Sequence, residues 1–276
     1  MEFDKLKVLR VSSILGELKS GGVGSTLPLH IRASDNKEYV LKTRYNTNTI
    51  HKDLSIFSEL LAHSLDKYFE FNLSPQKLVL LYVDETTQKI VEEAIEQEII
   101  TEDIEVLENI KNSFGFNLGI EYIKNVDRVE TTDMNKTFVK NIIHLDNYVI
   151  NNDREESNPN ILKSLSNQKD FYAIDFDNAF NTHLVMEDII ANDLLKLQKA
   201  KECNITNDSK YLFSEQSKNI KQGQKLSISE DEVLNIIDTI FPEEWENILK
   251  YKESISEIIS ARIGNKTIFK REHNGC

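Results

Sequence analysis

The chain has 276 residues, of which 39% are hydrophobic and 29% charged, and its net charge is −13. This composition is typical of a soluble globular protein that can bury a substantial core. The sequence contains no run of about 18 apolar residues, so no membrane span is predicted. Residues 1–10 lack the apolar core of a secretory signal. Acidic segments such as 92–108 would repel phosphate backbones and anionic lipid surfaces, so neither nucleic acid nor a membrane is expected as a direct partner.

The two cysteines, Cys203 and Cys276, have no cysteine or histidine neighbour at metal-ligand spacing. We expect free thiols, as is usual in a reducing cytoplasm. The six histidines form neither an HxH nor an HExxH pattern, so no zinc site is predicted. His144 is expected to serve packing or capping.

The first 45 residues are rich in short β-branched or apolar runs, at 5–11, 27–33 and 39–45. The polar segment 34–38 predicts a turn, so 27–33 and 39–43 are expected to pair as a hairpin. The pattern then changes. Leucine and phenylalanine recur at three- and four-residue spacing from Leu54, which predicts an amphipathic helix ending near Tyr68.

A strand is predicted over 77–83, a helix over 88–112, and a strand or extended connector over 118–123. The remainder is predicted to be mostly helical, over 136–150, 184–200, 230–239 and 243–263. A β-rich first part before a helical second part predicts an α+β fold of two lobes with a cleft between them. We expect an amino-terminal lobe over 1–123 and a carboxy-terminal lobe over 124–276.

Three of the nine glycines fall in GGVG at 21–24, directly before a predicted strand. Glycine lets a backbone turn sharply, and consecutive amide groups can cradle phosphate oxygens. The candidate phosphate-binding residues are Gly21, Gly22, Gly24 and Ser25. A plain hairpin turn is the alternative.

Lys42 shares one face of its strand with Val40. A strand lysine that points into a cleft can pair with nucleotide phosphates, and such a lysine is usually held by a glutamate on the next helix. Glu59 lies on the helix predicted after this strand. The acids Glu38, Asp53 and Glu70 compete for that role, and the alternative is that Lys42 and Glu59 both lie at the surface.

The polar loop 151–162 and the segment 171–180 carry the strongest pattern. Phosphoryl transfer needs a carboxylate near the attacking hydroxyl and hard oxygen ligands for Mg²⁺. Asp153 can serve the hydroxyl, while Asn160 and Asp175 can hold the metal. Asn158 competes with Asn160, but Pro159 stiffens the backbone and Asn158 is expected to cap the turn with its side chain.

These segments resemble the HipA-like kinase family. The resemblance rests on Asn152-Asp153-Arg154, Asn158-Pro159-Asn160-Ile161-Leu162, and Ala173-Ile174-Asp175 with Ala179-Phe180. It covers about residues 15–185, with the glycine-rich turn, Lys42 and Glu59 in the family's order. It implies a protein-kinase-like fold in which Asp153 is the catalytic base, Asn160 and Asp175 are Mg²⁺ ligands, and Lys42 pairs with phosphate. Phe176 stands where the family usually has histidine.

The expected function is therefore an ATP-dependent kinase that moves the γ-phosphate of Mg-ATP to a hydroxyl, first of all Ser or Thr of a protein. One alternative is a non-catalytic kinase-like module that acts through partners; it would tend to lose one of Asp153, Asn160 and Asp175. Another is a small-molecule phosphotransferase of the aminoglycoside type, which shares the mechanism. The sequence does not distinguish these acceptors, and it does not indicate an oligomeric state, an activation mechanism or a toxin role.

Overall fold

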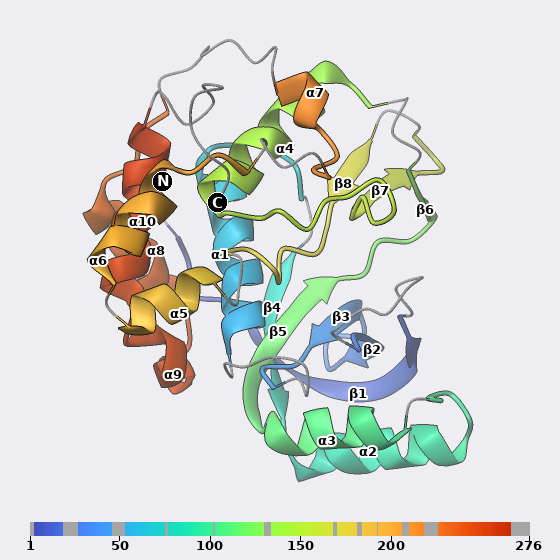
Figure 1. Cartoon of the computed structure of the whole chain (residues 1–276). Helices are drawn as coiled ribbons and strands as arrows, with labels where there is room; N and C mark the ends of the chain where they lie inside the picture. The colour runs from blue at the N-terminus through green and yellow to red at the C-terminus, as the bar shows by residue number, and fades with distance from the viewer. Residues whose placement is uncertain are drawn as a thin grey trace.

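The computed structural model describes most of the chain. The described residues are 3–18, 27–45, 53–74, 77–101, 103–129, 134–167, 170–180, 184–191, 193–205, 210–217 and 226–265. Within them the protein has a strand-rich N-terminal region and a helical C-terminal part (Figure 1).

The N-terminal region is built on a closed barrel with the strand order β1-β2-β3-β5-β4. Its strands are β1 (Val8–Glu17), β2 (Leu29–Ala33), β3 (Glu38–Lys42), β4 (Leu78–Val83) and β5 (Gly115–Glu121). The predicted hairpin is confirmed, because β2 and β3 pair antiparallel with Leu29 opposite Leu41. Parallel pairing of β1 with β4 closes the barrel.

Side-chain alternation on β3 separates two packing environments. Tyr39 and Leu41 point into the barrel, where they join its buried core. Val40 faces the other way and packs against the larger core that surrounds the first helix. Because side chains two apart on a strand share a face, Lys42 leaves the strand on the same side as Val40.

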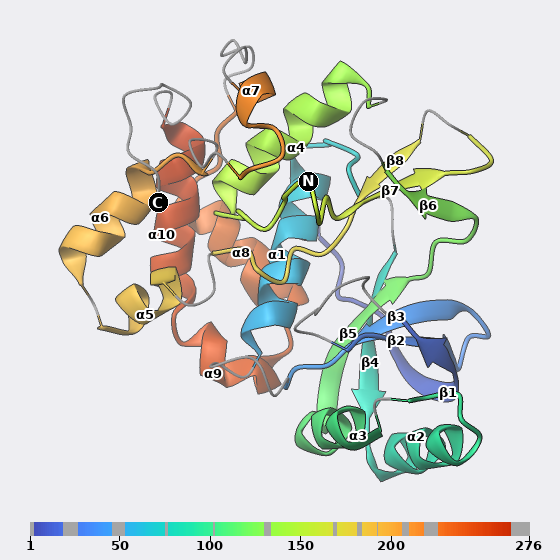
Figure 2. The ribbon, with the colours of Figure 1, turned by 45° about the vertical axis from the view of Figure 1, so that its right-hand side comes forward.

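The predicted helix is confirmed as α1 (Leu54–Tyr68), which lies at the centre of the molecule (Figure 2). Every residue from Leu54 to Asp66 is buried. The apolar side chains of α1 join a core shared with the C-terminal helices and with β4 and β5. A polar side chain on α1 is therefore held in a fixed, largely dry environment.

The acidic stretch 88–112 forms two helices, so the prediction of one helix is wrong there. Asp84 caps α2 (Glu85–Glu96) by accepting hydrogen bonds from the amides of Thr86 and Thr87. The chain then turns through Glu98, which has a φ of 59°, before α3 (Asp103–Asn112). Both helices pack on the outside of the barrel (Figure 1), with their apolar faces in its core.

A second, three-stranded sheet follows the barrel, in the order β6-β7-β8. It consists of β6 (Val126–Arg128), β7 (Ile161–Ser164) and β8 (Phe171–Ala173), and α4 (Lys136–Tyr148) precedes β7. The loop between α4 and β7 carries Asp153, and the segment after β8 carries Asp175. Antiparallel pairing of Ile161 with Ala173 brings these two segments together.

Two of the remaining predicted helices correspond to several shorter helices. The stretch predicted over 184–200 contains α5 (Leu184–Ala191) and α6 (Leu194–Glu202), and the stretch 243–263 contains η3 (Glu243–Trp245), α9 (Glu246–Leu249) and α10 (Lys252–Gly264). A short helix α7 (Ser214–Ser217) precedes α8 (Glu230–Ile240). The α8 prediction is confirmed, and Ser229 and Glu232 form a capping box at its start.

The N-terminal region and the C-terminal helices also contact each other directly, apart from the chain connection that follows β5. The indole Nε1 of Trp245 donates to the carbonyl of Phe116 at 2.9 Å, and the amide of Phe116 donates to Oε2 of Glu244 at 3.1 Å. Arg44 adds a hydrogen bond to the Glu244 carbonyl at 2.7 Å. We call this set of hydrogen bonds the β5–η3 contact.

Among the described residues there is no free cysteine, and Cys203 is disulfide-bonded. The expectation of a free thiol at Cys203 is therefore wrong, and it no longer supports a reducing compartment. Cys276 lies outside the described residues. No helix in the described part of the chain is long and apolar enough to cross a membrane. His144 is buried and packs beside Tyr148, as expected.

Candidate functional site

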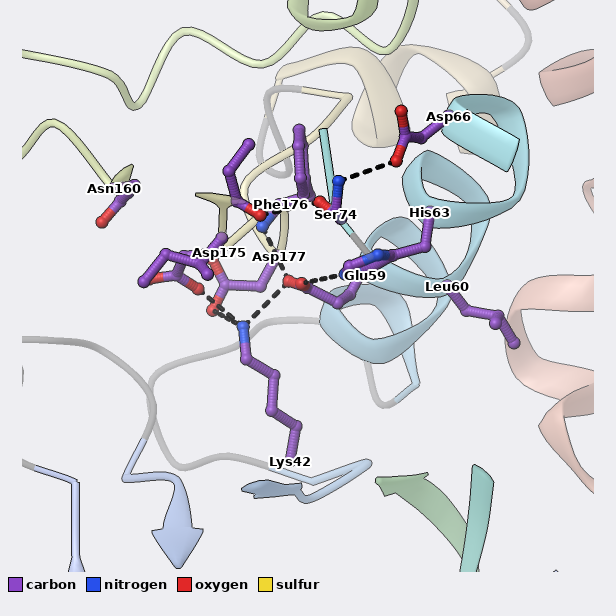
Figure 3. Close-up of polar contacts among 12 residues, drawn as sticks. Lys42, Glu59, Leu60, His63, Asp66, Ser74, Asn160, Asp175, Phe176 and Asp177 are labelled. Atoms are coloured by element: carbon purple, nitrogen blue, oxygen red, sulfur yellow. Dashed lines mark hydrogen bonds and ion pairs between the residues drawn. The ribbon is translucent and has the colours of Figure 1, made fainter. Parts of the chain in front are cut away.

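Lys42, at the end of β3, is the centre of a cluster of buried charges (Figure 3). Its Nζ lies 2.9 Å from Oε2 of Glu59 and 2.6 Å from Oδ1 of Asp175. Asp177 lies slightly farther away, with 3.9 Å between Nζ and Oδ2. The structure thus brings together three residues that the sequence placed on a strand, a helix and a distant loop.

Glu59 is the glutamate that holds Lys42, and its three competitors have other partners or positions. Asp53 forms an ion pair with Arg44 at 2.6 Å. Glu38 contacts His30 and Lys124, and Glu70 is exposed. Of these four acids, Glu59, in the middle of buried α1, is the one that contacts the lysine.

Glu59 also holds the segment after β8. Its Oε2 accepts a hydrogen bond from the amide of Phe176 at 2.7 Å, and its Oε1 lies 3.1 Å from Nε2 of His63. The carboxylate therefore joins β3, α1 and the Asp175 segment. Asp175 has a φ of 61°, an uncommon left-handed conformation for a residue that is not glycine.

The charges in this cluster shift one another's pKa values. Burial alone would raise the pKa of Glu59, but the charge of Lys42 and the hydrogen bond from His63 outweigh it and lower this pKa to about 2. Burial opposes the charge of Lys42, yet the carboxylates of Asp175, Glu59 and Asp177 raise its pKa. Lys42 and Glu59 are thus both ionised at neutral pH.

Asp177 is a carboxylate that the sequence analysis did not single out. Burial, followed by the negative charge of Asp175, raises its pKa to about 7, against the opposing effect of Lys42. Its position two residues after Asp175 was the one available signal, since a short loop can direct both carboxylates toward the same cation. The site therefore carries a third acid beside Lys42.

Asp153 and Asn160 face each other across the loop that precedes β7. The amide Nδ2 of Asn160 lies 3.4 Å from Oδ2 of Asp153 and 3.5 Å from its main-chain oxygen. Burial, and then the charge of Asp175, raise the pKa of Asp153, while a hydrogen bond from Asn178 opposes the shift. The carboxylate of Asp153 is therefore a stronger proton acceptor than an exposed aspartate.

Asn158 takes no comparable part. Its backbone exchanges hydrogen bonds with Glu155 at 3.1 and 3.2 Å, and these close the turn. Its side chain has no hydrogen-bond partner within the described ranges, so the expectation that this side chain caps the turn is wrong. Asn160, which is buried and has a φ of 49°, is the asparagine directed at Asp153.

Arg154 holds the loop of Asp153 and the segment that carries Asp175 from their buried side. Its side chain is fully buried and pairs with Asp146 of α4 at 2.8 Å. The Nη1 atom donates to the carbonyl of Asn160 at 2.7 Å and to that of Ile174 at 3.2 Å. The Arg154 guanidinium therefore connects the Asp153 loop to the backbone of Asn160 and to Ile174, the residue before Asp175.

A comparison with protein-family models identifies the family of the chain. The family model described as HipA-like kinase matches residues 11–267. The chain belongs to the HipA-like kinase family. The match extends beyond the part of the chain in which the sequence motifs were recognised, to the end of the C-terminal helices.

Other comparisons gave weaker results. A search of the curated proteins found no match. Among solved structures, the crystal structure of the Golgi casein kinase is similar with 13% identity and a TM-score of 0.38, covering 99% of this chain and 78% of that chain. The structure of the Golgi casein kinase with Mn/ADP bound has 9% identity and a TM-score of 0.34, covering 99% and 76%.

Phe176 is the residue by which this member departs from the family pattern, and the structure shows what it contacts. It is fully buried, with the Arg154 guanidinium 4.7 Å from its ring centroid and the His63 ring edge-on at 5.8 Å. The aromatic ring packs between these two groups. Its backbone amide, which any residue would supply, makes the hydrogen bond to Glu59.

The candidate phosphate-binding turn lies outside the described residues. This applies to Gly21, Gly22, Gly24 and Ser25. Its flanking strands β1 and β2 are adjacent in the barrel, with Glu17 opposite Leu29. In the described part of the chain, no three or more His, Cys, Asp or Glu side chains are grouped to hold a metal ion.

Proposed function

We propose that this chain is an ATP-dependent protein kinase that transfers the γ-phosphate of Mg-ATP to a Ser or Thr hydroxyl. The proposal includes two lobes, over about 1–123 and 124–276, with the nucleotide between them. The observation that carries it is the position of Lys42 within 3 Å of both Glu59 and Asp175. A strand lysine, a helix glutamate and a loop aspartate in this arrangement are the parts that kinases use to position phosphates.

In this proposal Lys42 pairs with phosphate oxygens of the nucleotide and Glu59 keeps it in place. Glu59 is suited to this because it is buried, ionised and held by two further hydrogen bonds. The amides of Gly21, Gly22, Gly24 and Ser25 would cover the phosphates. Release of the Asp175 carboxylate from Lys42 would accompany nucleotide binding, since both groups would then take phosphate or metal partners.

The residues present fit a magnesium ion. Asp175 offers a carboxylate whose side chain is 29% exposed, and Asn160 directs its amide nitrogen at Asp153, which leaves its amide oxygen for a metal. Magnesium in kinases is held by few protein ligands together with phosphate oxygens and water, so one Asp and one Asn suffice. A bound Mg²⁺ would neutralise phosphate charge there.

Asp153 would act on the acceptor. The hydroxyl oxygen forms a bond to the γ-phosphorus, the bond from that phosphorus to the bridging β–γ oxygen breaks, and ADP leaves. The hydroxyl proton passes to the Asp153 carboxylate, whose raised pKa favours this transfer. Arg154 keeps Asp153 and the Asn160 backbone in register from the buried side.

The same chemistry would suit the hydroxyl of a small molecule. The second candidate function is that of a non-catalytic kinase-like module that acts through partners. The complete set of Asp153, Asn160 and Asp175 favours catalysis, because a binding module has no need of the residue that accepts the proton. The test is incubation of the full chain with Mg-ATP and a cell lysate, followed by mass spectrometry for phosphorylated Ser and Thr.

The expected result is autophosphorylation or labelled lysate proteins that are lost in Asp153→Asn. Mg-ATP should also stabilise the native chain, by about 2.7 kcal/mol at 100 times the dissociation constant. Stabilisation without transfer to any protein or to aminoglycosides would favour the non-catalytic module. No stabilisation by millimolar Mg-ATP would rule out the proposal.

A further inference from the structure

A cavity of about 640 Å³ lies beside α1 and is lined by its residues from Leu60 to Lys67 that include His63, Ser64 and Asp66. Its apolar walls come from four parts of the chain: the N-terminal segment (Phe3, Leu6), α1 (Leu60), the start of β4 (Leu78) and the end of α8 (Ile240). Figure 3 shows the Leu60 side chain directed away from Lys42, and Asp66 farther along α1. The volume falls within the range of small-molecule sites.

The polar groups in the inner wall present hydrogen-bond acceptors. The hydroxyls of Ser64 and Ser74 both donate to backbone carbonyls at 2.7 Å, so their lone pairs remain for an occupant. Asp66 accepts the amides of Leu73 and Ser74 at 3.0 and 2.9 Å. These two bonds use about half of the acceptor capacity of a carboxylate.

His63 supplies a further polar group in this wall. Its side chain is only 3% exposed and lines the cavity. Because Glu59 is ionised, Nε2 of His63 must carry the hydrogen of the bond between them. The other ring nitrogen, Nδ1, has no hydrogen-bond partner among the described residues.

The charges at the rim do not change this preference. Two exposed lysines, Lys67 and Lys77, are balanced by two exposed acids, Asp4 and Glu70. The Nζ of Lys67 lies 5.3 Å from the centroid of the Phe3 ring, at the edge of the cavity. Asp66 is the acid of the inner wall, so a buried occupant meets a carboxylate beside the serine oxygens.

We propose that this cavity binds a small amphipathic cation, with an apolar body against Leu60, Leu78 and Ile240 and a protonated amine or guanidine directed at Asp66 and His63. Donor groups of the occupant match the acceptors of the wall, and its positive charge matches Asp66. The apolar walls exclude a strongly hydrated inorganic cation as the preferred ligand.

Occupancy would reach the nucleotide site through His63, a consequence that rests on the proposed function. A group of the occupant bonded to Nδ1 would hold the His63 ring in the orientation in which Nε2 bonds Glu59, and Glu59 positions both Lys42 and the Phe176 amide. The occupant and Mg-ATP should therefore increase each other's affinity, by about fivefold or more. His63 is a positioning residue in this account.

The binding test uses calorimetry on the full chain with tryptamine and phenylguanidine as probes. Indole-3-propionate, which has the same ring but a carboxylate, is the charge control. We expect binding of a cationic probe but not of the acid, loss of binding in Leu78→Trp, which fills the cavity, and tenfold weakening in Asp66→Asn. The matched control Leu165→Trp, at an exposed position outside the cavity, should bind normally.

Failure of both cationic probes to bind would overturn the proposal, as would binding that Leu78→Trp leaves unchanged. Coupling is read from Mg-ATP affinity with and without the probe and from the ¹⁵N signals of the His63 ring. If Mg-ATP does not bind at all, the proposed function fails, but probe binding and the His63 signals still decide the cavity. Bound probe with unchanged His63 signals would refute the link to Glu59.

Discussion

The amide of Phe176 and the carboxylate of Glu59 meet at 2.7 Å, although 117 residues separate them in sequence. The same Oε2 atom accepts the Lys42 ammonium at 2.9 Å. One oxygen therefore sets the position of both the strand lysine and the segment that carries Asp175. Displacement of Glu59 would disturb both at once.

The first prediction concerns the pH dependence of this carboxylate. The pKa of Glu59 is lowered to about 2 in the folded protein. The ionised carboxylate therefore contributes its full stabilisation above about pH 4.5, and this stabilisation is lost as the pH falls toward 2. Glu59→Gln should cost up to about 3 kcal/mol at pH 7 and much less at pH 3. Urea denaturation of both proteins at several pH values measures this difference.

A matched control for Glu59 is Glu93→Gln, which changes a carboxylate on the exposed side of α2. Its effect should be within about 0.5 kcal/mol at every pH. A cost of Glu59→Gln that stays constant from pH 7 to pH 3 would contradict the ionic role of Glu59.

The second prediction separates two aspartates by function. Asp175→Asn should weaken Mg-dependent ATP binding, because the carboxylate proposed to hold the metal is lost. Asp153→Asn should leave ATP affinity nearly intact and lower turnover by about 10² to 10⁴, the range for loss of a general base. Calorimetry and a phosphate-transfer assay distinguish them, with the exposed Glu156→Gln in the same loop as control. Equal losses of ATP affinity would refute the assigned roles.

The third prediction concerns the choice of asparagine. Asn160→Ala removes the side chain that faces Asp153 and should abolish phosphate transfer while the chain remains folded. The side chain of Asn158 has no described partner, so Asn158→Ala should change stability by less than about 0.5 kcal/mol and keep activity. Circular dichroism and the transfer assay would show both. An inactive Asn158→Ala beside an active Asn160→Ala would place the metal ligand two residues earlier.

The fourth prediction tests the buried pair under the site. Arg154→Met leaves Asp146 buried without its charge partner. Loss of one partner of a buried ion pair typically costs about 3–5 kcal/mol of stability, and we expect a loss of about that size here. The double variant with Asp146→Leu removes both charges and should recover a large part of the loss. Denaturant unfolding of the single and double variants measures it. A loss below about 1 kcal/mol in Arg154→Met would show that the pair does not hold the two loops.

Local patterns predicted the elements that surround the site, because their periods are strong. The hairpin of β2 and β3 and the helix α1 were confirmed. The closure of the barrel was not foreseen, since it depends on parallel pairing of Val8 with Leu80, far apart in the chain. The break between α2 and α3 was also missed, because Glu98 adopts its positive φ without glycine or proline to signal it.

The candidate site shows the same division. Lys42, Glu59 and Asp175 were predicted from their order and residue types, and the structure places them in contact. His63 and Asp177 were missed because a single histidine or aspartate has no motif of its own. For His63 a signal existed, namely its i+4 spacing from Glu59 on one helix face. The contacts of Arg154 depend on three segments, so no local pattern could have revealed them.

Both ends of β5 are connected to parts of the chain outside the barrel. The chain leaves the C-terminal end of this strand toward β6, and the β5–η3 contact holds its first residues through Phe116. Because β5 is held at its two ends, we expect relative motion of the barrel and the rest of the protein to be a rotation about this strand. In the barrel, β1 and β2 are the strands that do not adjoin β5. They would therefore travel farthest in such a rotation.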